Sequence, residues 1–310
     1  MPKSKIINLK STALTLTNLR RAWNDVADNA GGPGVDDVTL TQWNRNWEER
    51  LIKLARAVRS NQYKPGGLRI RRIPKPNAPD MRVLRIPTIT DRILQRAVYQ
   101  QLAPICERRF FTCSYGYRPG RSLLDAVRHI THLRKQGHHW VLDADIDDFF
   151  NQIDHALLRR FLRLDFYDTS LLPLIESWLQ SWQIQPGEAR GIAMGSPLSP
   201  LLANIYLHRL DDDLQNHGYK PVRYADDFLV LSSSPPDWRR SYPVTQRALT
   251  KLKLRYEPRK TQLTTFEEGF EFLGVHFEEG WYWYTWDDKR IEVRDDENDE
   301  LFHLYGPEYY

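Results

Sequence analysis

The chain contains little cysteine, and it has no long hydrophobic run. Its 310 residues include only Cys106 and Cys113, so neither a cysteine-based zinc site nor a disulfide scaffold is expected. No apolar stretch reaches the length of about eighteen residues that a membrane-spanning helix requires. Residues 1–8 lack the apolar core of a signal peptide. We therefore expect a cytoplasmic protein with reduced cysteines and no membrane partner.

Charge is distributed unevenly along the chain. The formal net charge is only +4, but residues 1–135 carry 26 Lys and Arg against 10 Asp and Glu. Residues 136–310 have the opposite balance, with 18 basic and 30 acidic residues. A basic half suits contacts with nucleic-acid phosphates, and an acidic half can hold metal ions. In the segment 68–73 arginines alternate with apolar residues, which predicts a hairpin strand with a basic face.

Acidic residues interrupt two strand-like apolar segments. Asp226 and Asp227 stand in the middle of the segment 222–231, and Asp145 follows a similar segment that begins at Val141. Carboxylates are costly to bury side by side unless a cation lies between them, and Mg²⁺ takes one or two carboxylates together with substrate phosphates. The pair Ala225-Asp226 also suits the turn of a hairpin. Two acid-bearing strands brought together favour a two-metal phosphoryl-transfer site, and hence a polymerase.

Several blocks of the sequence occur in the order typical of one enzyme family. The central block is Tyr224-Ala225-Asp226-Asp227, and the others are 72–77, 85–92, 114–122, 195–204 and 272–274. Together they resemble reverse transcriptases of the bacterial group II intron-like branch, which includes CRISPR-associated reverse transcriptases. The matching blocks run from about Leu19 to Gly274, so the resemblance covers most of the chain.

This resemblance implies the fingers and palm of a right-hand polymerase, which is an α+β fold. The palm is expected to be a split βαβ (ferredoxin-like) antiparallel sheet with helices, and the thumb to be short or absent. Four segments are expected: an N-terminal helical extension at 1–60, fingers at 61–138, a palm with the catalytic site at 139–275, and a short C-terminal strand with an acidic tail at 276–310.

Local patterns predict individual elements within these segments. Gly31-Gly32-Pro33-Gly34 separates two helices in the segment 14–60. Residues 66–87 predict a basic hairpin that turns at 76–80. The second of the two helices in 14–60 is predicted at 41–59. Further helices are predicted at 90–105, 122–135 and 154–163, and strands at 140–146, on both sides of Ala225-Asp226 and at 281–286.

The resemblance also assigns the metal ligands. Asp145 and Asp226 are expected to bridge two Mg²⁺ ions, with Mn²⁺ as an alternative metal. Asp227 matches the third acid of the motif and is expected to support the site. The main-chain carbonyl of Ile146 is the remaining expected ligand. Lys260 matches a lysine near the end of the palm that protonates or neutralises the leaving pyrophosphate.

Neighbouring acids compete with Asp145 on composition alone. Asp143, Asp147 and Asp148 lie within three residues of it, and strand alternation places Asp143 on the same face. The register of the family motif selects Asp145 among them.

Other residues are expected to hold the substrates. Phe150 lies where the family has its steric gate, an aromatic ring that leaves no room for a ribose 2′-hydroxyl. Lys75 and Arg82 match the basic residues that hold the triphosphate. Met194-Gly195 stands where relatives usually have Gln-Gly beside the nucleotide and template, and methionine can pack there but cannot direct a hydrogen bond. Altered fidelity or nucleotide affinity is the expected consequence.

The sequence therefore predicts an RNA-directed DNA polymerase whose partners are an RNA template, a DNA or RNA primer and dNTPs. Its predicted setting is CRISPR spacer acquisition from RNA together with CRISPR integrase proteins, with anti-phage defence or a mobile element as alternatives. A non-catalytic RNA-binding subunit, or a maturase-like protein of a group II intron-type element, is a different class of function. An RNA-dependent RNA polymerase is disfavoured by Phe150.

Overall fold

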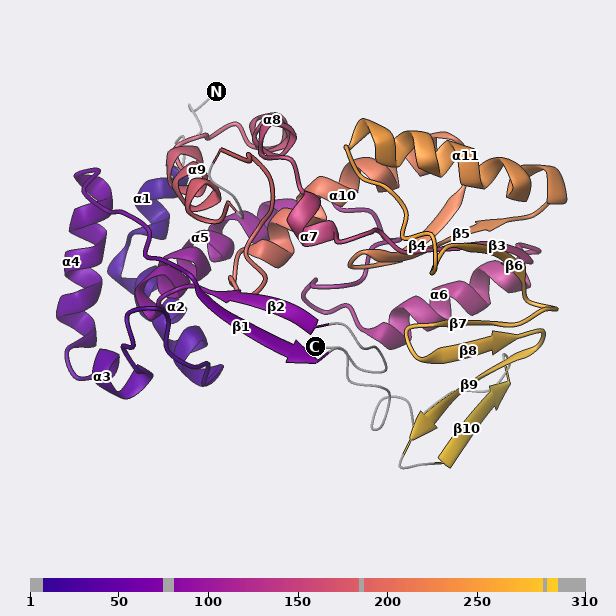
Figure 1. The fold of residues 1–310 in the computed structure, drawn as a ribbon, viewed down its shortest axis with the longest axis horizontal. Coiled ribbons are helices and arrows are strands. Elements are labelled where there is room, and N and C mark those ends of the chain that lie inside the picture. Colours follow the sequence, from indigo (N-terminus) through magenta and orange to yellow (C-terminus); the bar gives the residue numbers. More distant parts are fainter. Residues whose placement is uncertain (1–7, 75–80, 184–186, 287–288, 295–310) are drawn as a thin grey trace, which may run out of the picture. The chain divides into compact units, whose positions relative to one another are not determined.

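A computed structural model of the chain describes residues 8–74, 81–183, 187–286 and 289–294. The described residues form two units that interleave along the sequence (Figure 1). The first unit takes its residues from Met1–Arg109 and Phe150–Tyr206, and the second from Phe110–Phe149 and Leu207–Tyr310. This division does not test the four predicted segments, which stay a prediction.

The first unit consists mainly of helices. Thr15 caps α2 by accepting a hydrogen bond from the main-chain N–H of Asn18, and the apolar side of α2 packs against α5. The helices of this unit are α1 (Leu9–Ala13), α2 (Leu16–Asp28), α3 (Leu40–Asn44), α4 (Trp47–Arg59), α5 (Ile89–Glu107), α8 (His155–Asp165) and α9 (Leu172–Ser181). Two further helices, α7 (Phe149–Gln152) and α10 (Ser199–Asn216), contain the boundaries between the units.

The single helix predicted at 41–59 is wrong, because the structure has two helices there. Thr39 and Gln42 form a capping box at the start of α3. Asn46 then has φ −137° and ψ 42°, which is not helical, and α4 begins at the next residue. Both helices contribute to the core, since Trp43 of α3 is 1% exposed and Leu51 of α4 is fully buried.

The predicted hairpin is formed by β1 (Arg69–Pro74) and β2 (Met81–Ile86), which pair antiparallel. Its predicted turn at 76–80 lies outside the described residues. The pairing Ile73↔Arg82 places Arg82 on the same face as Arg71, whereas Arg72 lies on the opposite face. The register therefore agrees with the predicted basic face, which carries Arg71 and Arg82, and Arg72 adds a positive charge on the opposite face.

The central sheet of the second unit contains β3 (Trp140–Ala144), β4 (Lys220–Tyr224), β5 (Asp227–Ser232) and β6 (Gln262–Thr265). Its strand order is β4-β5-β3-β6, and all neighbouring strands are antiparallel. α11 (Pro235–Lys251) connects β5 to β6 and packs on the sheet. This is the order of a ferredoxin-like split βαβ sheet, as the sequence predicted.

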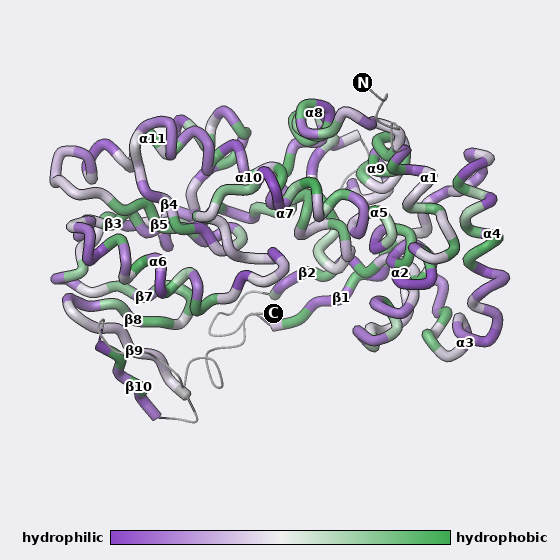
Figure 2. The backbone as a smooth tube through the Cα atoms, turned by 180° about the vertical axis from the view of Figure 1, so that it is seen from behind, coloured by the Kyte–Doolittle hydropathy of each residue, from purple (hydrophilic) through white to green (hydrophobic). Residues whose placement is uncertain are grey.

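A second sheet follows in the chain, formed by β7 (Phe270–Phe272), β8 (Val275–Glu278), β9 (Trp281–Trp286) and β10 (Lys289–Arg294) in the order β10-β9-β8-β7. α6 (Leu123–Lys135) lies between this sheet and the central one (Figure 1). One apolar core joins all three layers, and its fully buried members include Ile130 of α6, Leu229 of β5 and Tyr284 of β9. Figure 2 shows hydrophobic residues along the strands that border this core.

The strand predicted at 281–286 is confirmed as β9, whereas β10 was not predicted. The acidic stretch at 295–300 lies outside the described residues. Cys106 and Cys113 are free and buried, as expected for reduced thiols. None of the helices in the described ranges is long and apolar enough to cross a membrane.

Candidate active site

The first acid of the candidate site follows the end of β3. Asp145 comes directly after Ala144, is 8% exposed, and its main-chain carbonyl accepts a hydrogen bond from the N–H of Glu257 over 2.9 Å. Ile146 is 2% exposed and forms an isolated bridge with Tyr256. The segment that leads to Lys260 is therefore held against the end of the first acid-bearing strand.

The second pair of acids lies where β4 turns into β5. Tyr224 pairs with Asp227, which leaves Ala225 and Asp226 as a two-residue turn. Ala225 has φ +59°, in the left-handed region that alanine rarely adopts. The hairpin turn that the sequence allowed is thus present, and it carries Asp226 at its tip and Asp227 at the first position of β5.

Strand pairing brings these acids together. β3 and β5 are neighbours, and their last pair is Ala144↔Phe228, so the next position outward sets Asp145 beside Asp227. Burial, reinforced by the negative charges of Asp145 and Asp226, raises the pKa of Asp227 to about 7. Ionisation of Asp227 is therefore disfavoured both by its burial and by the two neighbouring acids.

Lys260 supplies part of the missing positive charge. Its Nζ donates a hydrogen bond to Oδ2 of Asp145 over 2.5 Å. Burial alone would lower the pKa of Lys260, but the hydrogen bond to Asp145 and the nearby charges of Asp227 and Asp226 raise it overall. The lysine therefore stays protonated beside the acids.

The three other acids near Asp145 in the sequence, Asp143, Asp147 and Asp148, have different surroundings. Burial raises the pKa of Asp143 to about 6, and its Oδ2 accepts a hydrogen bond from Gln262 over 3.3 Å. Asp147 forms an ion pair with Arg255 at 2.6 Å. Asp148 has φ +42°. Neither Gln262 nor Arg255 was predicted from the sequence, because only strand pairing and loop packing bring these residues to the acids.

The donor set of the site suits a divalent cation that also binds substrate. Among the described residues, no three His, Cys, Asp or Glu side chains form a metal-binding group by themselves. Mg²⁺ does not require such a group, because it uses one or two carboxylates and completes its coordination with water and phosphate oxygens. Burial and the negative charges of Asp145 and Asp226 together disfavour ionisation of Asp227, and a bound cation would offset both effects.

The predicted substrate residues belong to the first unit. Phe150 is 8% exposed, and its main-chain carbonyl accepts a hydrogen bond from the N–H of Ile192 over 2.8 Å. The main-chain carbonyl of Met194 accepts one from the N–H of Arg85 in β2 over 2.7 Å. A Cβ at position 195 would lie 3.1 Å from the Arg85 carbonyl oxygen, and Gly195 has φ +121°. The Met194-Gly195 loop therefore packs closely against the end of β2.

The two basic fingers residues differ in what the structure shows of them. Arg82 is exposed on β2, opposite Ile73. Lys75 lies outside the described residues.

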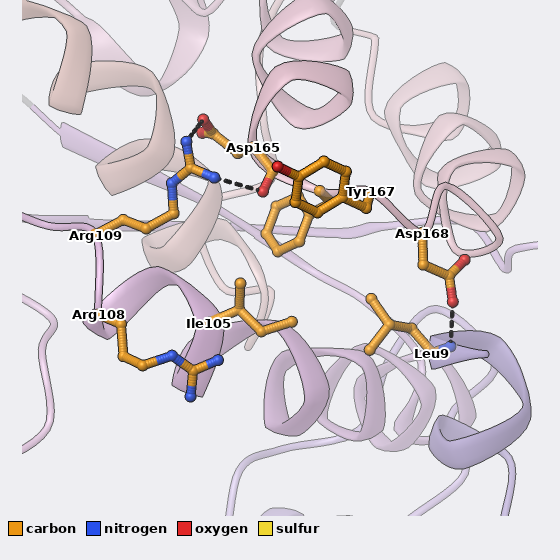
Figure 3. Close-up of a pocket in the computed structure, with 8 residues that line it drawn as sticks. Leu9, Ile105, Arg108, Arg109, Asp165, Tyr167 and Asp168 are labelled. Atoms are coloured by element: carbon orange, nitrogen blue, oxygen red, sulfur yellow. Dashed lines mark hydrogen bonds and ion pairs between the residues drawn. The ribbon is translucent and has the colours of Figure 1, made fainter. Parts of the chain in front are cut away.

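A pocket elsewhere in the first unit has no catalytic character (Figure 3). Leu9, Ile105 and Phe166 contribute apolar side chains to it. Its two acids are already engaged: Asp165 pairs with Arg109 at 3.1 Å, and Asp168 accepts a hydrogen bond from the N–H of Leu9 over 2.5 Å. The candidate chemistry therefore belongs to the acids of the second unit.

A comparison with known protein families identifies this acid-bearing sheet. The model of the family described as "Reverse transcriptase (RNA-dependent DNA polymerase)" matches residues 73–277, which is more than half of the chain. The chain belongs to the reverse transcriptase family. It is therefore an RNA-directed DNA polymerase by family, and the predicted enzyme class is confirmed.

Among curated relatives of this reverse transcriptase is the group II intron-encoded protein LtrA of Lactococcus lactis subsp. cremoris. The two are 33% identical over 255 residues, which cover 80% of this chain and 41% of LtrA. The chain thus spans less than half the length of that relative. The match agrees with the group II intron-like branch that the sequence blocks indicated.

Comparison with solved structures gives two further matches. The telomerase of Candida albicans, in a complex with a fragment of telomeric RNA, matches with a TM-score of 0.51 and 15% identity, over 77% of this chain and 48% of that one. A partial Cas6-RT-Cas1–Cas2 complex matches with a TM-score of 0.48 and 28% identity, over 80% of this chain and 42% of that one. The α+β polymerase fold predicted from the sequence is confirmed by the family match and the telomerase likeness.

Proposed function

We propose that this reverse transcriptase extends a primer with deoxynucleotides on an RNA template, by phosphoryl transfer at Asp145, Asp226 and Asp227 with two Mg²⁺ ions. One observation carries the proposal: the pairing of β3 with β5 sets Asp145 beside Asp227, next to the turn that carries Asp226, and burial together with the charges of Asp145 and Asp226 raises the pKa of Asp227 to about 7. A protein that only binds RNA has no use for a cluster of buried and half-buried carboxylates.

Each acid has a proposed role. Asp145, directly after β3, and Asp226, in the turn between β4 and β5, would hold both cations, with the main-chain carbonyl of Ile146 as a further ligand. When bound, the cations stabilise the attacking 3′-oxygen and the leaving pyrophosphate. Asp227 is the first residue after the turn and adds its negative charge to the site. Mn²⁺ has similar ligand preferences and is the expected substitute.

Lys260 is the proposed proton donor to the leaving group. It is protonated beside Asp145, and its side chain is 64% exposed, so its ammonium group can move toward a bound pyrophosphate. In the structure without substrate it neutralises Asp145. The same charge would then serve the acids before the reaction and the pyrophosphate at its end.

The nucleotide is proposed to be selected and held by five residues other than the acids. Phe150 is the proposed steric gate against the ribose 2′-hydroxyl, and Lys75 and Arg82 are the proposed ligands of the triphosphate. Met194 and Gly195 are proposed to face the nucleotide and template. The hydrogen bond between Arg85 and Met194 supports a fixed loop there.

The biological setting stays a prediction. Spacer acquisition from RNA with CRISPR integrase proteins in the cytoplasm rests on the resemblance of sequence blocks. The genes next to this one are the direct test of that setting: an adjacent CRISPR integrase gene would support it, and intron RNA around the gene would favour a mobile element.

A primer-extension experiment tests the proposed reaction. A labelled DNA primer is annealed to an RNA or a DNA template and incubated with dNTPs or rNTPs, in Mg²⁺, Mn²⁺ or EDTA. We expect dNTP-dependent extension on RNA in Mg²⁺ and none in EDTA. Binding of the duplex without extension would identify a non-catalytic RNA-binding subunit, and preferred extension with rNTPs would identify an RNA polymerase.

A further inference from the structure

Arg223, the residue before the Tyr-Ala-Asp-Asp motif, is a buried arginine in β4 with 1% exposure. Its guanidinium group forms a two-pronged ion pair with Asp211 of α10: Nε lies 2.8 Å from Oδ1, and Nη2 lies 2.7 Å from Oδ2. Asp211 is also 1% exposed. A buried ion pair is tolerated only when its geometry is good and its other hydrogen-bonding atoms have partners.

The remaining donors of Arg223 reach two further parts of the second unit. Nη1 donates to the main-chain carbonyl of Ala225 over 2.9 Å, and Nη2 donates to Oγ of Ser114 over 2.8 Å. The main chain of Arg223 accepts a hydrogen bond from the N–H of Tyr115 and donates one to the carbonyl of Cys113, each at 2.8 Å. One side chain thus connects a helix, a neighbouring loop and the turn that carries Asp226.

The bond to Ala225 constrains an unusual backbone. Ala225 has φ +59°, and a non-glycine residue in this region persists only where its surroundings over-determine it. The Ala225 carbonyl belongs to the peptide that leads to Asp226. Fixing this carbonyl fixes the plane of that peptide, and with it the direction in which the Asp226 carboxylate leaves the turn.

We propose that Arg223 is a positioning residue for the reaction: it acts through the Ala225 carbonyl to orient Asp226, and Asp211 holds its guanidinium in place. The inference rests on the proposed function. A purely structural role would require only that Arg223 neutralise Asp211. Lysine could meet that requirement, but its single ammonium cannot reproduce the planar fork that reaches Asp211, Ala225 and Ser114 together.

The test compares Arg223→Lys with Arg134→Lys. Arg134 is a matched control, since it is also buried in the second unit, at 6% exposure, and donates to a main-chain carbonyl, that of Glu278, over 2.8 Å. For both variants kcat and the KM for dNTP are measured per folded molecule, with folding followed by thermal melting. Mn²⁺ binding without nucleic acid or nucleotide is measured by electron paramagnetic resonance.

For Arg223→Lys we expect kcat to fall by roughly 10- to 100-fold, because small displacements of catalytic groups have effects of this order. The KM for dNTP should stay near the wild-type value, and the Kd for Mn²⁺ should rise several-fold. Arg134→Lys should change the melting temperature alone. Wild-type kcat and Mn²⁺ affinity in folded Arg223→Lys would overturn the inference.

A second variant covers the case in which Arg223→Lys does not fold. The double variant Asp211→Asn, Arg223→Gln removes both charges together and leaves neutral groups that can hydrogen-bond with each other. It should show the same losses of kcat and Mn²⁺ affinity, and its retention of both would contradict the inference. If the wild-type chain binds Mn²⁺ but extends no primer, the proposed function fails, whereas the Mn²⁺ affinities still decide the role of Arg223.

Discussion

Gly116 lies against the main chain of Ala225. A Cβ at position 116 would be 2.4 Å from the nitrogen of Ala225 and 3.0 Å from the carbonyl carbon of Tyr224, which are backbone atoms that cannot rotate away. The loop that contains Gly116 therefore approaches the acid-bearing turn more closely than a residue with a side chain would allow.

Replacing this glycine should displace the turn. We expect Gly116→Ala to lower kcat by roughly 100-fold, because an added methyl group must shift either the loop or the turn. Gly120→Ala is the control: Gly120 has φ +66° in the same loop, but nothing lies within 4 Å of its added Cβ. Thermal melting should show that backbone strain lowers the melting temperature of the control, while primer extension by the control stays near wild type. Gly116→Ala should lose catalysis. Equal kcat values in the two variants would show that the close approach has no catalytic role.

The pKa of Asp227 predicts a pH-dependent effect on stability. The folded protein keeps a proton on Asp227 up to a pH of about 7, whereas an unfolded aspartate releases it near its ordinary pKa of 3.8. The wild-type protein therefore loses stability as the pH rises through this window. We expect Asp227→Asn to raise the melting temperature of the metal-free protein at pH 8, by about 2–4 °C for each kcal/mol gained.

The same difference should be small near pH 4, because this pH lies at the lower edge of the window and little stability has yet been lost. Melting curves in EDTA between pH 4 and pH 8 measure it. A difference between the two proteins that does not grow with pH would mean that the three acids do not repel one another in the folded state.

The hairpin arginines should set the salt dependence of binding to an RNA–DNA duplex. Arg71 and Arg72 are exposed on β1. Arg69 instead donates a hydrogen bond to the Gly34 carbonyl over 2.9 Å and forms an ion pair with Asp37. Charge reversal at Arg71 and Arg72 should weaken binding and reduce the salt slope by about 0.9 for each phosphate that the arginines no longer neutralise.

The control reverses the exposed pair Arg239 and Arg240 on α11, which has the same charge change at another place. Fluorescence anisotropy at several salt concentrations gives both slopes. If the α11 variant shows as large a reduction in slope as the hairpin variant, overall charge and not the hairpin governs binding.

The proposed gate predicts a change in sugar selectivity. Truncating Phe150 to Ala should raise ribonucleotide use relative to deoxynucleotide use, because it removes the ring that would meet the 2′-hydroxyl. Some loss of stability is also expected, since Phe150 is 8% exposed and its removal leaves a cavity. The ratio of kcat/KM for dNTP over rNTP separates the two effects. Phe149→Ala, at a residue that is 2% exposed, controls for lost packing, and an unchanged ratio in Phe150→Ala would exclude it as the gate.

The sequence predicted the central sheet and the three acids, because each is encoded locally. The acids interrupt apolar strands, and Ala225-Asp226 fits a tight turn between β4 and β5. The resemblance to a family supplied the register that distinguishes Asp145 from Asp143. Composition alone could not make this distinction, because both acids lie within one short strand segment.

Contacts between distant segments could not be predicted in the same way. Arg223 was not singled out from the sequence, because its pairing with Asp211 depends on how α10 packs against β4. The packing of Gly116 against Ala225 likewise arises from tertiary structure. β10 was not predicted because its strand carries charged residues, and it is held by pairing with β9.

The central claim is that Asp145 and Asp226 bind the catalytic metals, and single-turnover primer extension tests it most directly. Wild type, Asp145→Ala, Asp226→Ala and the control Asp147→Ala are compared on an RNA template with dNTPs and Mg²⁺, after melting curves confirm folding. Asp147 is an acid close to Asp145 in sequence, but it pairs with Arg255. We predict that extension falls by several orders of magnitude in the first two variants and by less than tenfold in the control. Substantial extension by folded Asp145→Ala or Asp226→Ala would contradict the account.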